Sequence, residues 1–88
     1  MKKRNDVLIA SFETQQETQM NTLIQVFYEK YNDCGTIILT KEKGGRVGVR
    51  IEAKRDVEQL ITALTKLKKK IGDTFDYQKY QEWKRLSE

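Results

Sequence analysis

The sequence of 88 residues contains no histidine and a single cysteine. Histidine is the commonest general base in enzymes and the commonest protein ligand of transition metals, and it activates serine and cysteine nucleophiles. A zinc-type site built from cysteine and histidine is therefore nearly excluded. We find no combination of residue types that would form a catalytic centre, and we expect a protein that is not an enzyme and carries no cofactor or metal ion.

A lone cysteine, Cys34, cannot form a disulfide bond within the chain. Unpaired cysteine is typical of the reducing cytoplasm, so we expect a cytoplasmic protein, and we interpret Cys34 as a small residue at a junction between a helix and a strand. A reactive thiol would need a base or an electropositive pocket beside it. The chain also has no apolar run of the ~18–20 residues that cross a bilayer and no signal-peptide pattern, so we expect no membrane partner.

Proline, internal repeats and Ser/Gly-rich linkers are all absent from the sequence. The length is near the lower limit for a chain that folds alone, and we expect one domain over residues 1–88, with residues 1–5 as a disordered basic lead. The formal net charge of +4 permits binding to nucleic acid without requiring it.

The first part of the chain predicts a strand followed by a helix. Residues 6–12 are apolar and β-prone, which indicates a buried strand. Thr14 and Glu17 have the spacing of a helix capping box, and Gly35 can end a helix. Between them, apolar residues recur at intervals of three and four: Met20, Leu23, Ile24, Phe27, Tyr28 and Tyr31. This stripe predicts an amphipathic helix.

The same segment has an alternative interpretation. Ile24, Val26 and Tyr28 alternate, which is the pattern of a strand over residues 23–31. The chain would then form a four-stranded sheet followed by a helix. The capping box and the length of the apolar stripe favour the helix.

The next two strands, 36–42 and 46–52, predict a hairpin. A three-residue loop, 43–45, aligns their apolar residues and puts Gly45 at the left-handed last position of the loop. This register predicts three cross-strand pairs: Ile37 with Ile51, Leu39 with Val49, and Glu42 with Arg46.

A second helix is predicted from Asp56 to the residue before Gly72, and residues 74–88 predict a shorter third helix. The stripe of the second helix consists of Val57, Leu60, Ile61, Leu64, Leu67 and Ile71. The resulting fold class is α+β, in the order β-α-β-β-α plus a short C-terminal helix. We expect a small three-stranded sheet with two helices on one face, and a right-handed crossover if its first two strands are parallel neighbours.

One group of candidate binding residues lies in the second predicted helix. Lys66, Lys69 and Lys70 could contact phosphate groups. Their alternative role is to complement the dipole at the end of the helix.

A second group lies on the sheet face opposite the apolar residues. Arg46, Gly48 and Arg50 would share this face, which could receive a nucleic-acid strand if it is open. In the alternative interpretation Arg46 pairs with Glu42 while Gly48 makes room for a packed aromatic side chain.

The third group is the aromatic tail, with Tyr77, Tyr80 and Trp83 between basic residues. Such a composition is typical of base-stacking surfaces and of protein interfaces. The rings could instead fold back and cap the core.

These patterns predict a small non-catalytic regulatory module that acts on nucleic acid, or on a complex that handles it, through a basic surface. The alternative is a protein–protein interaction module, such as an inhibitor or adaptor, that uses the aromatic tail or an exposed sheet edge. A homodimer would also fit.

Overall fold

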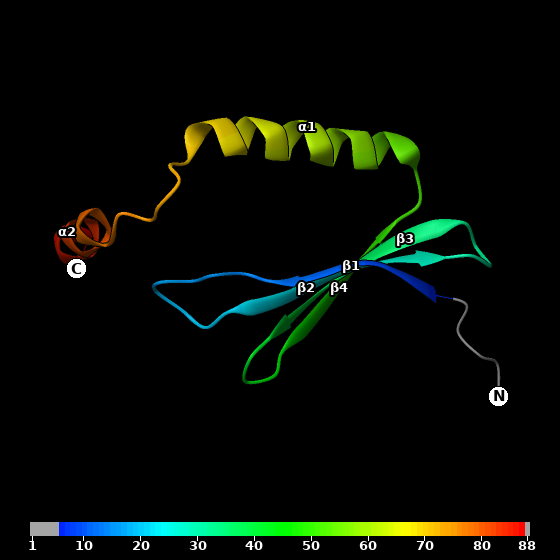
Figure 1. The fold of residues 1–88 in the computed structure, drawn as a ribbon, viewed down its shortest axis with the longest axis horizontal. Coiled ribbons are helices and arrows are strands. Elements are labelled where there is room, and N and C mark those ends of the chain that lie inside the picture. Colours follow the sequence, from blue (N-terminus) through cyan, green and yellow to red (C-terminus); the bar gives the residue numbers. More distant parts are fainter. Residues whose placement is uncertain (1–5, 88) are drawn as a thin grey trace.

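The chain forms a four-stranded antiparallel sheet followed by two helices, as the computed structural model of residues 6–87 shows (Figure 1). The elements are β1 Asp6–Glu13, β2 Thr22–Glu29, β3 Cys34–Lys41, β4 Arg46–Ile51, α1 Lys54–Lys70 and α2 Tyr77–Ser87. The strand order is β1-β2-β3-β4, so each strand pairs with its neighbour in the sequence. The α+β class is confirmed, and the predicted basic lead at residues 1–5 lies outside the described residues.

The three-stranded sheet and the helix predicted after β1 are wrong, because residues 22–29 form strand β2. Thr14 closes a hairpin instead of capping a helix. Its backbone N–H donates to the carbonyl oxygen of Thr22 at 2.9 Å, and the N–H of Thr22 donates to Thr14 Oγ1 at 2.9 Å. With every pair of strands antiparallel, the sheet of residues 6–51 contains no crossover connection.

The apolar spacing of strand β2 resembles that of a helix because the strand lies in the middle of the sheet. Its register with β3 puts Ile24, Val26 and Tyr28 on one face and Leu23 and Phe27 on the other. Apolar residues on both faces satisfy the spacing of three and four as well as the alternation. The β-branched and aromatic residues of this segment favour the extended conformation, so the four-stranded alternative is the correct one.

A short turn connects the paired strands β2 and β3. Asp33 adopts a left-handed conformation with φ of 51°, and its Oδ1 accepts a hydrogen bond from the hydroxyl of Tyr28 at 2.7 Å. This hydrogen bond, which only the neutral phenol can donate, is the main reason why the pKa of Tyr28 is raised. Gly35, predicted to end a helix, instead lies in β3 opposite Tyr28.

The β3–β4 hairpin has a three-residue loop, but the loop begins one residue earlier than predicted. The N–H of Gly44 donates to the carbonyl of Lys41, and the N–H of Lys41 donates to the carbonyl of Gly45, both at 3.0 Å. Gly44, with φ of 93°, is therefore the left-handed last loop residue, and Gly45 follows with φ of 87°. A turn followed by a left-handed glycine is a favoured hairpin geometry, and the first of the two glycines takes that position.

The shifted loop changes the cross-strand pairs without changing the faces. Ile37 lies opposite Val49 and Arg46 opposite Thr40, so the predicted pairs Ile37–Ile51, Leu39–Val49 and Glu42–Arg46 are wrong. The two registers differ by two residues, which is one full period of a strand. Each side chain of β4 consequently stays on the face that the sequence predicts.

The two predicted C-terminal helices are present. Helix α1 begins at Lys54, two residues before the predicted start at Asp56. Its C-cap residue is Ile71, directly before Gly72. Helix α2 lies within the tail, where Asp76 Oδ1 accepts a hydrogen bond from the N–H of Lys79 at 3.0 Å. No helix within residues 6–87 is both long and apolar enough to cross a membrane.

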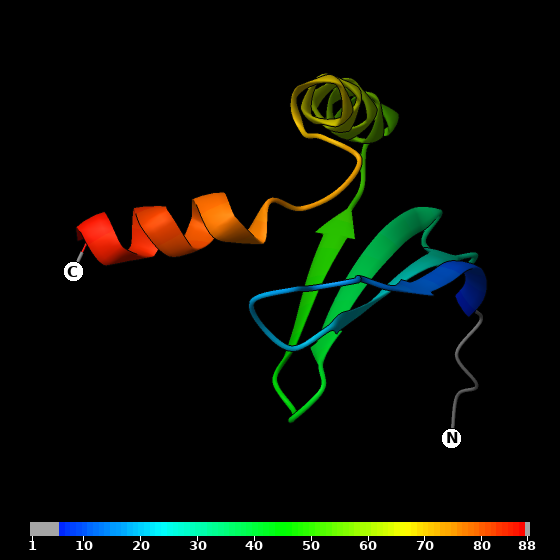
Figure 2. The same cartoon turned by 60° about the vertical axis from the view of Figure 1, so that its left-hand side comes forward.

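Neither helix covers the sheet, in contrast to the predicted two-layer arrangement. Within the described chain, α1 approaches β4 alone and α2 approaches no other element. Figures 1 and 2 show α1 beside the sheet and α2 projecting away from it. The radius of gyration is 16.7 Å, against about 12 Å for a compact chain of this length. Cys34 is the only described residue that is buried, with 5% of its surface exposed.

Candidate nucleic-acid interface

The sheet has an apolar face and a more polar face, which the strand registers define. Residues that pair across strands share a face. The apolar face carries Val7, Ala10, Phe12, Ile24, Val26, Tyr28, Ile37, Leu39, Val47, Val49 and Ile51. On β3 and β4 the other face carries Thr36, Ile38, Thr40, Arg46, Gly48 and Arg50. We call Arg46, Gly48 and Arg50 the arginine strip.

The arginine strip is open to solvent. All three residues are exposed, and a methyl group added at Gly48 would meet no atom within 4 Å. The interpretation in which an aromatic side chain packs on Gly48 is therefore wrong for the described chain. The predicted partner of Arg46, Glu42, lies in the hairpin loop, and Arg46 makes no ion pair with a carboxylate among residues 6–87.

The geometry of the strip follows from the rise of a strand. Arg46 and Arg50 are four residues apart on the same face, so their Cα atoms are about 13 Å apart. Gly48 lies midway between them and contributes no side chain. The two arginines thus flank Gly48, and Thr36, Ile38 and Thr40 of β3 border the strip.

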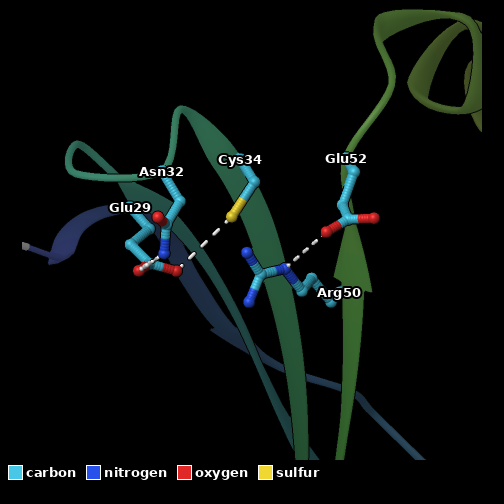
Figure 3. A network of polar contacts seen from close by, with 5 residues as sticks. All are labelled: Glu29, Asn32, Cys34, Arg50 and Glu52. Carbon is cyan, nitrogen blue, oxygen red and sulfur yellow. Dashed lines mark hydrogen bonds and ion pairs between the residues drawn. The ribbon is translucent and has the colours of Figure 1, made fainter.

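Acidic residues surround one end of the strip (Figure 3). Arg50 Nε lies 3.1 Å from Glu52 Oε2, and both side chains are more than half exposed. Exposed ion pairs of this kind contribute only about 0–1 kcal/mol to stability, so an incoming anion can compete with Glu52. Arg46, at the other end, faces no such competition in the described chain.

Cys34 lies beside Arg50 at the acidic end of the strip. Its thiol donates a hydrogen bond to Glu29 Oε2 at 3.4 Å, and Glu29 Oε1 accepts one from Asn32 Nδ2 at 2.5 Å. Burial is the main cause that raises the pKa of the Cys34 thiol, with a further contribution from Glu29, while Arg50 acts in the opposite direction. A raised pKa disfavours the nucleophilic thiolate.

The lysines predicted as a patch lie far from the arginine strip. The first turns of α1 approach β4, where Asp56 and Leu60 line a hollow with Val49, Arg50 and Ile51. Lys66, Lys69 and Lys70 are exposed in the last turns of the same helix, which is about 25 Å long. The lysines of α1 and the arginine strip therefore form two separate basic surfaces, and the single basic surface predicted from the sequence is divided.

The aromatic tail forms a ridge of rings along α2. Ring centroids are 5.8 Å apart for Phe75 and Tyr80, 6.3 Å for Tyr77 and Tyr80, and 5.9 Å for Tyr80 and Trp83. These distances are typical of interacting aromatic pairs. Trp83 remains 62% exposed and α2 contacts no strand. The rings thus pack on one another within the tail and do not fold back onto the sheet.

Sequence reasoning identified the arginine strip but missed the exposure of the apolar surfaces. Nineteen large apolar side chains are exposed in residues 6–87, among them Phe12, Val47 and Leu64. The alternation in β4 and the stripe of α1 predict apolar faces, but neither pattern tells whether the same chain covers them. The described residues contain no group of three or more His, Cys, Asp or Glu side chains that could hold a metal ion.

No protein-family model, curated protein or solved structure matches this chain.

Proposed function

We propose that the chain is a non-catalytic module that binds single-stranded nucleic acid along the arginine strip and the adjoining residues of β3. The observation that carries this proposal is the open position of Gly48 between two exposed arginines. Arginine binds phosphate through paired hydrogen bonds and also stacks on bases. A glycine between two such groups lets a sugar or base lie directly on the backbone of the strand.

The open position of Gly48 between two arginines favours a single strand over a duplex. Reading duplex DNA in the major groove requires a protruding helix or a two-stranded ribbon that enters the groove. On β3 the same face presents Thr36 opposite Arg50, Ile38 opposite Gly48 and Thr40 opposite Arg46, so one apolar side chain lies beside the glycine. Open sheet faces of this kind bind unstacked bases and a backbone that follows the surface.

Charge neutralisation tests the proposal. The assay is fluorescence anisotropy of a labelled single-stranded oligonucleotide, titrated at two salt concentrations. Arg46→Ala should weaken binding roughly ten- to a hundredfold, because a hydrogen bond to a charged group contributes about 1.5–3 kcal/mol. Arg50→Ala should have a smaller effect because Glu52 competes for its guanidinium. Each change should reduce the salt dependence by about 0.7 in log K per log salt for each lost phosphate contact.

Matched variants on α1 provide the controls for this experiment. Arg55→Ala removes an exposed arginine outside the strip and should leave affinity unchanged. Glu52→Gln should raise affinity by freeing Arg50, whereas Glu58→Gln removes the same charge from α1 and should change affinity less. Absence of binding at the lower salt concentration, or equal losses in Arg46→Ala and Arg55→Ala, would refute a site on the strip.

The ridge on α2 supports a second candidate function, protein binding through the tail. Its rings are already ordered against one another, and Trp and Tyr are enriched among the residues that contribute most to protein interfaces. With Trp83 exposed, Trp83→Ala should leave the thermal unfolding of the chain unchanged and abolish capture of a protein partner. If Trp83→Ala unfolds the sheet, Trp83 belongs to the fold and the ridge is not an interface.

A further inference from the structure

The chain exposes far more surface than a folded protein of its mass. Its accessible surface is 8253 Å², whereas a compact monomer of 10.4 kDa exposes about 5,400 Å². The difference is about 2,900 Å². A chain with one buried residue among those described lacks the hydrophobic core that would stabilise it alone.

The exposed apolar groups form two surfaces that flank one space. One is the apolar sheet face, where Phe12 is 53% and Val47 59% exposed. The other is the stripe of α1, where the exposure ranges from 41% to 62%. The hollow lined by Val49, Ile51 and Leu60 connects the two surfaces where α1 begins, and Figure 2 shows α1 held apart from the strands.

The stripe of α1 has the spacing of a helix–helix seam. Five of its six residues, with Ile61 beside them, alternate in steps of three and four: Val57, Leu60, Leu64, Leu67 and Ile71. These are the a and d positions of consecutive heptads, the pattern with which one helix packs along another of the same kind. The seam itself contains no charged residue. Within the described chain, α2 makes no contact with α1, so the seam has no partner helix.

We infer that the folded unit is a pair of chains, in which the α1 seams of two copies pack against each other and the paired helices fill the space beside the apolar sheet faces. A second copy supplies both missing surfaces at once, and two-fold symmetry makes each copy complete the other. If each copy buries half of its excess surface, the interface totals about 2,900 Å², within the range of obligate homodimers.

This arrangement leaves the proposed nucleic-acid site free. The arginine strip lies on the opposite face of the sheet from the apolar residues. The inference therefore goes beyond the proposed function, and either can fail without the other.

The mass of the chain in solution tests the pairing. Light scattering after size exclusion should give twice the 10.4 kDa chain mass. The midpoint of thermal unfolding should rise with protein concentration, because association stabilises the folded state by mass action. A monomeric mass with a concentration-independent midpoint would overturn the inference, and so would a mass of three or more copies.

Two variants in the middle of α1 test whether the seam forms the interface. Leu64→Glu puts a charge in the seam and should abolish the dimeric mass. Thr62→Glu puts the same charge on the opposite side of the helix, where the Thr62 hydroxyl bonds only the helix backbone, and should leave the mass unchanged. A dimer that survives Leu64→Glu shows that the seam is not the interface.

Cross-linking gives a second readout that does not depend on dissociation. In a Cys34→Ser background, single cysteines are introduced in separate chains as Leu60→Cys, Leu64→Cys and Leu67→Cys, with Thr62→Cys as the control. On mild oxidation at least one seam cysteine should link two chains, since facing seam residues come within disulfide distance. Cross-linking of Thr62→Cys alone, or of none of the four, would contradict packing along the seam.

Discussion

Replacing Gly48 by valine should stabilise the folded chain and weaken its binding to nucleic acid. Gly48 lies inside strand β4, and the space above its Cα is empty. Its φ is outside the positive range in which side chains are strained, unlike that of Gly44 and Gly45. A β-branched side chain can therefore be added without a steric clash, but it will stand on the surface that we propose for a base or sugar.

The magnitude of the stabilisation follows from the cost of glycine in a strand. Glycine is less stable than alanine in a strand interior by roughly 0.5–1 kcal/mol, and the full range of strand propensities, with valine near the top, spans about 1 kcal/mol. Gly48→Val should thus add about 1 kcal/mol to the free energy of unfolding. For a domain of this size that raises the midpoint of thermal unfolding by about 4–8 °C.

The assay is thermal unfolding by circular dichroism at one fixed protein concentration, together with oligonucleotide anisotropy on the same samples. Gly44→Val is the matched control, because a side chain at φ of 93° is strained by about 1–2 kcal/mol, so this variant should unfold at a lower temperature. A lower midpoint for Gly48→Val would show that another group packs on Gly48. Unchanged affinity would show that the nucleic acid does not cross the strip.

Two further predictions concern Thr14 in the loop between β1 and β2, and Cys34. Thr14→Val should lower the free energy of unfolding by about 1 kcal/mol, because it removes the acceptor for the Thr22 amide. In chemical denaturation, Thr14→Ser and Glu17→Ala should each cost much less. An equal cost for Glu17→Ala would indicate a capped helix. The Cys34 thiol should be alkylated with a midpoint above the ordinary pKa of about 8.5, because its folded-state pKa is raised. Its contribution to stability should be complete below that ordinary value and be lost as the pH rises through the raised pKa. Alkylation at neutral pH as fast as that of free cysteine would contradict this.

Several elements could be predicted because one pattern determined each of them. Helix α1 has an unbroken stripe from Val57 to its cap residue Ile71, and no strand accommodates that spacing over such a length. The face occupied by Arg46 and Arg50 was predictable for a different reason. A shift of the hairpin by two residues leaves the face unchanged, so the error in the loop position did not affect the candidate site.

Strand β2 could not be distinguished from a helix by its apolar spacing, because its residues are apolar on both faces. Thr14 and Glu17 added a second misleading signal, since a threonine that closes a hairpin and a threonine that caps a helix both use the same hydroxyl acceptor. The β-branched residues were the informative signal. Whether the arginine strip is open depends on contacts with segments distant in the sequence, and local patterns do not contain that information.

The strand order β1-β2-β3-β4 has a consequence for how the chain folds. Every pairing in the sheet joins consecutive strands, so each hairpin closes over a short loop and the contact order within the sheet is low. Topologies of this kind form faster than those that need distant segments to meet. If two copies then associate through α1, the sheet of one chain should form rapidly but only transiently, because a single chain has no core that would stabilise it. Association should follow in a slower phase whose rate depends on how often two chains meet.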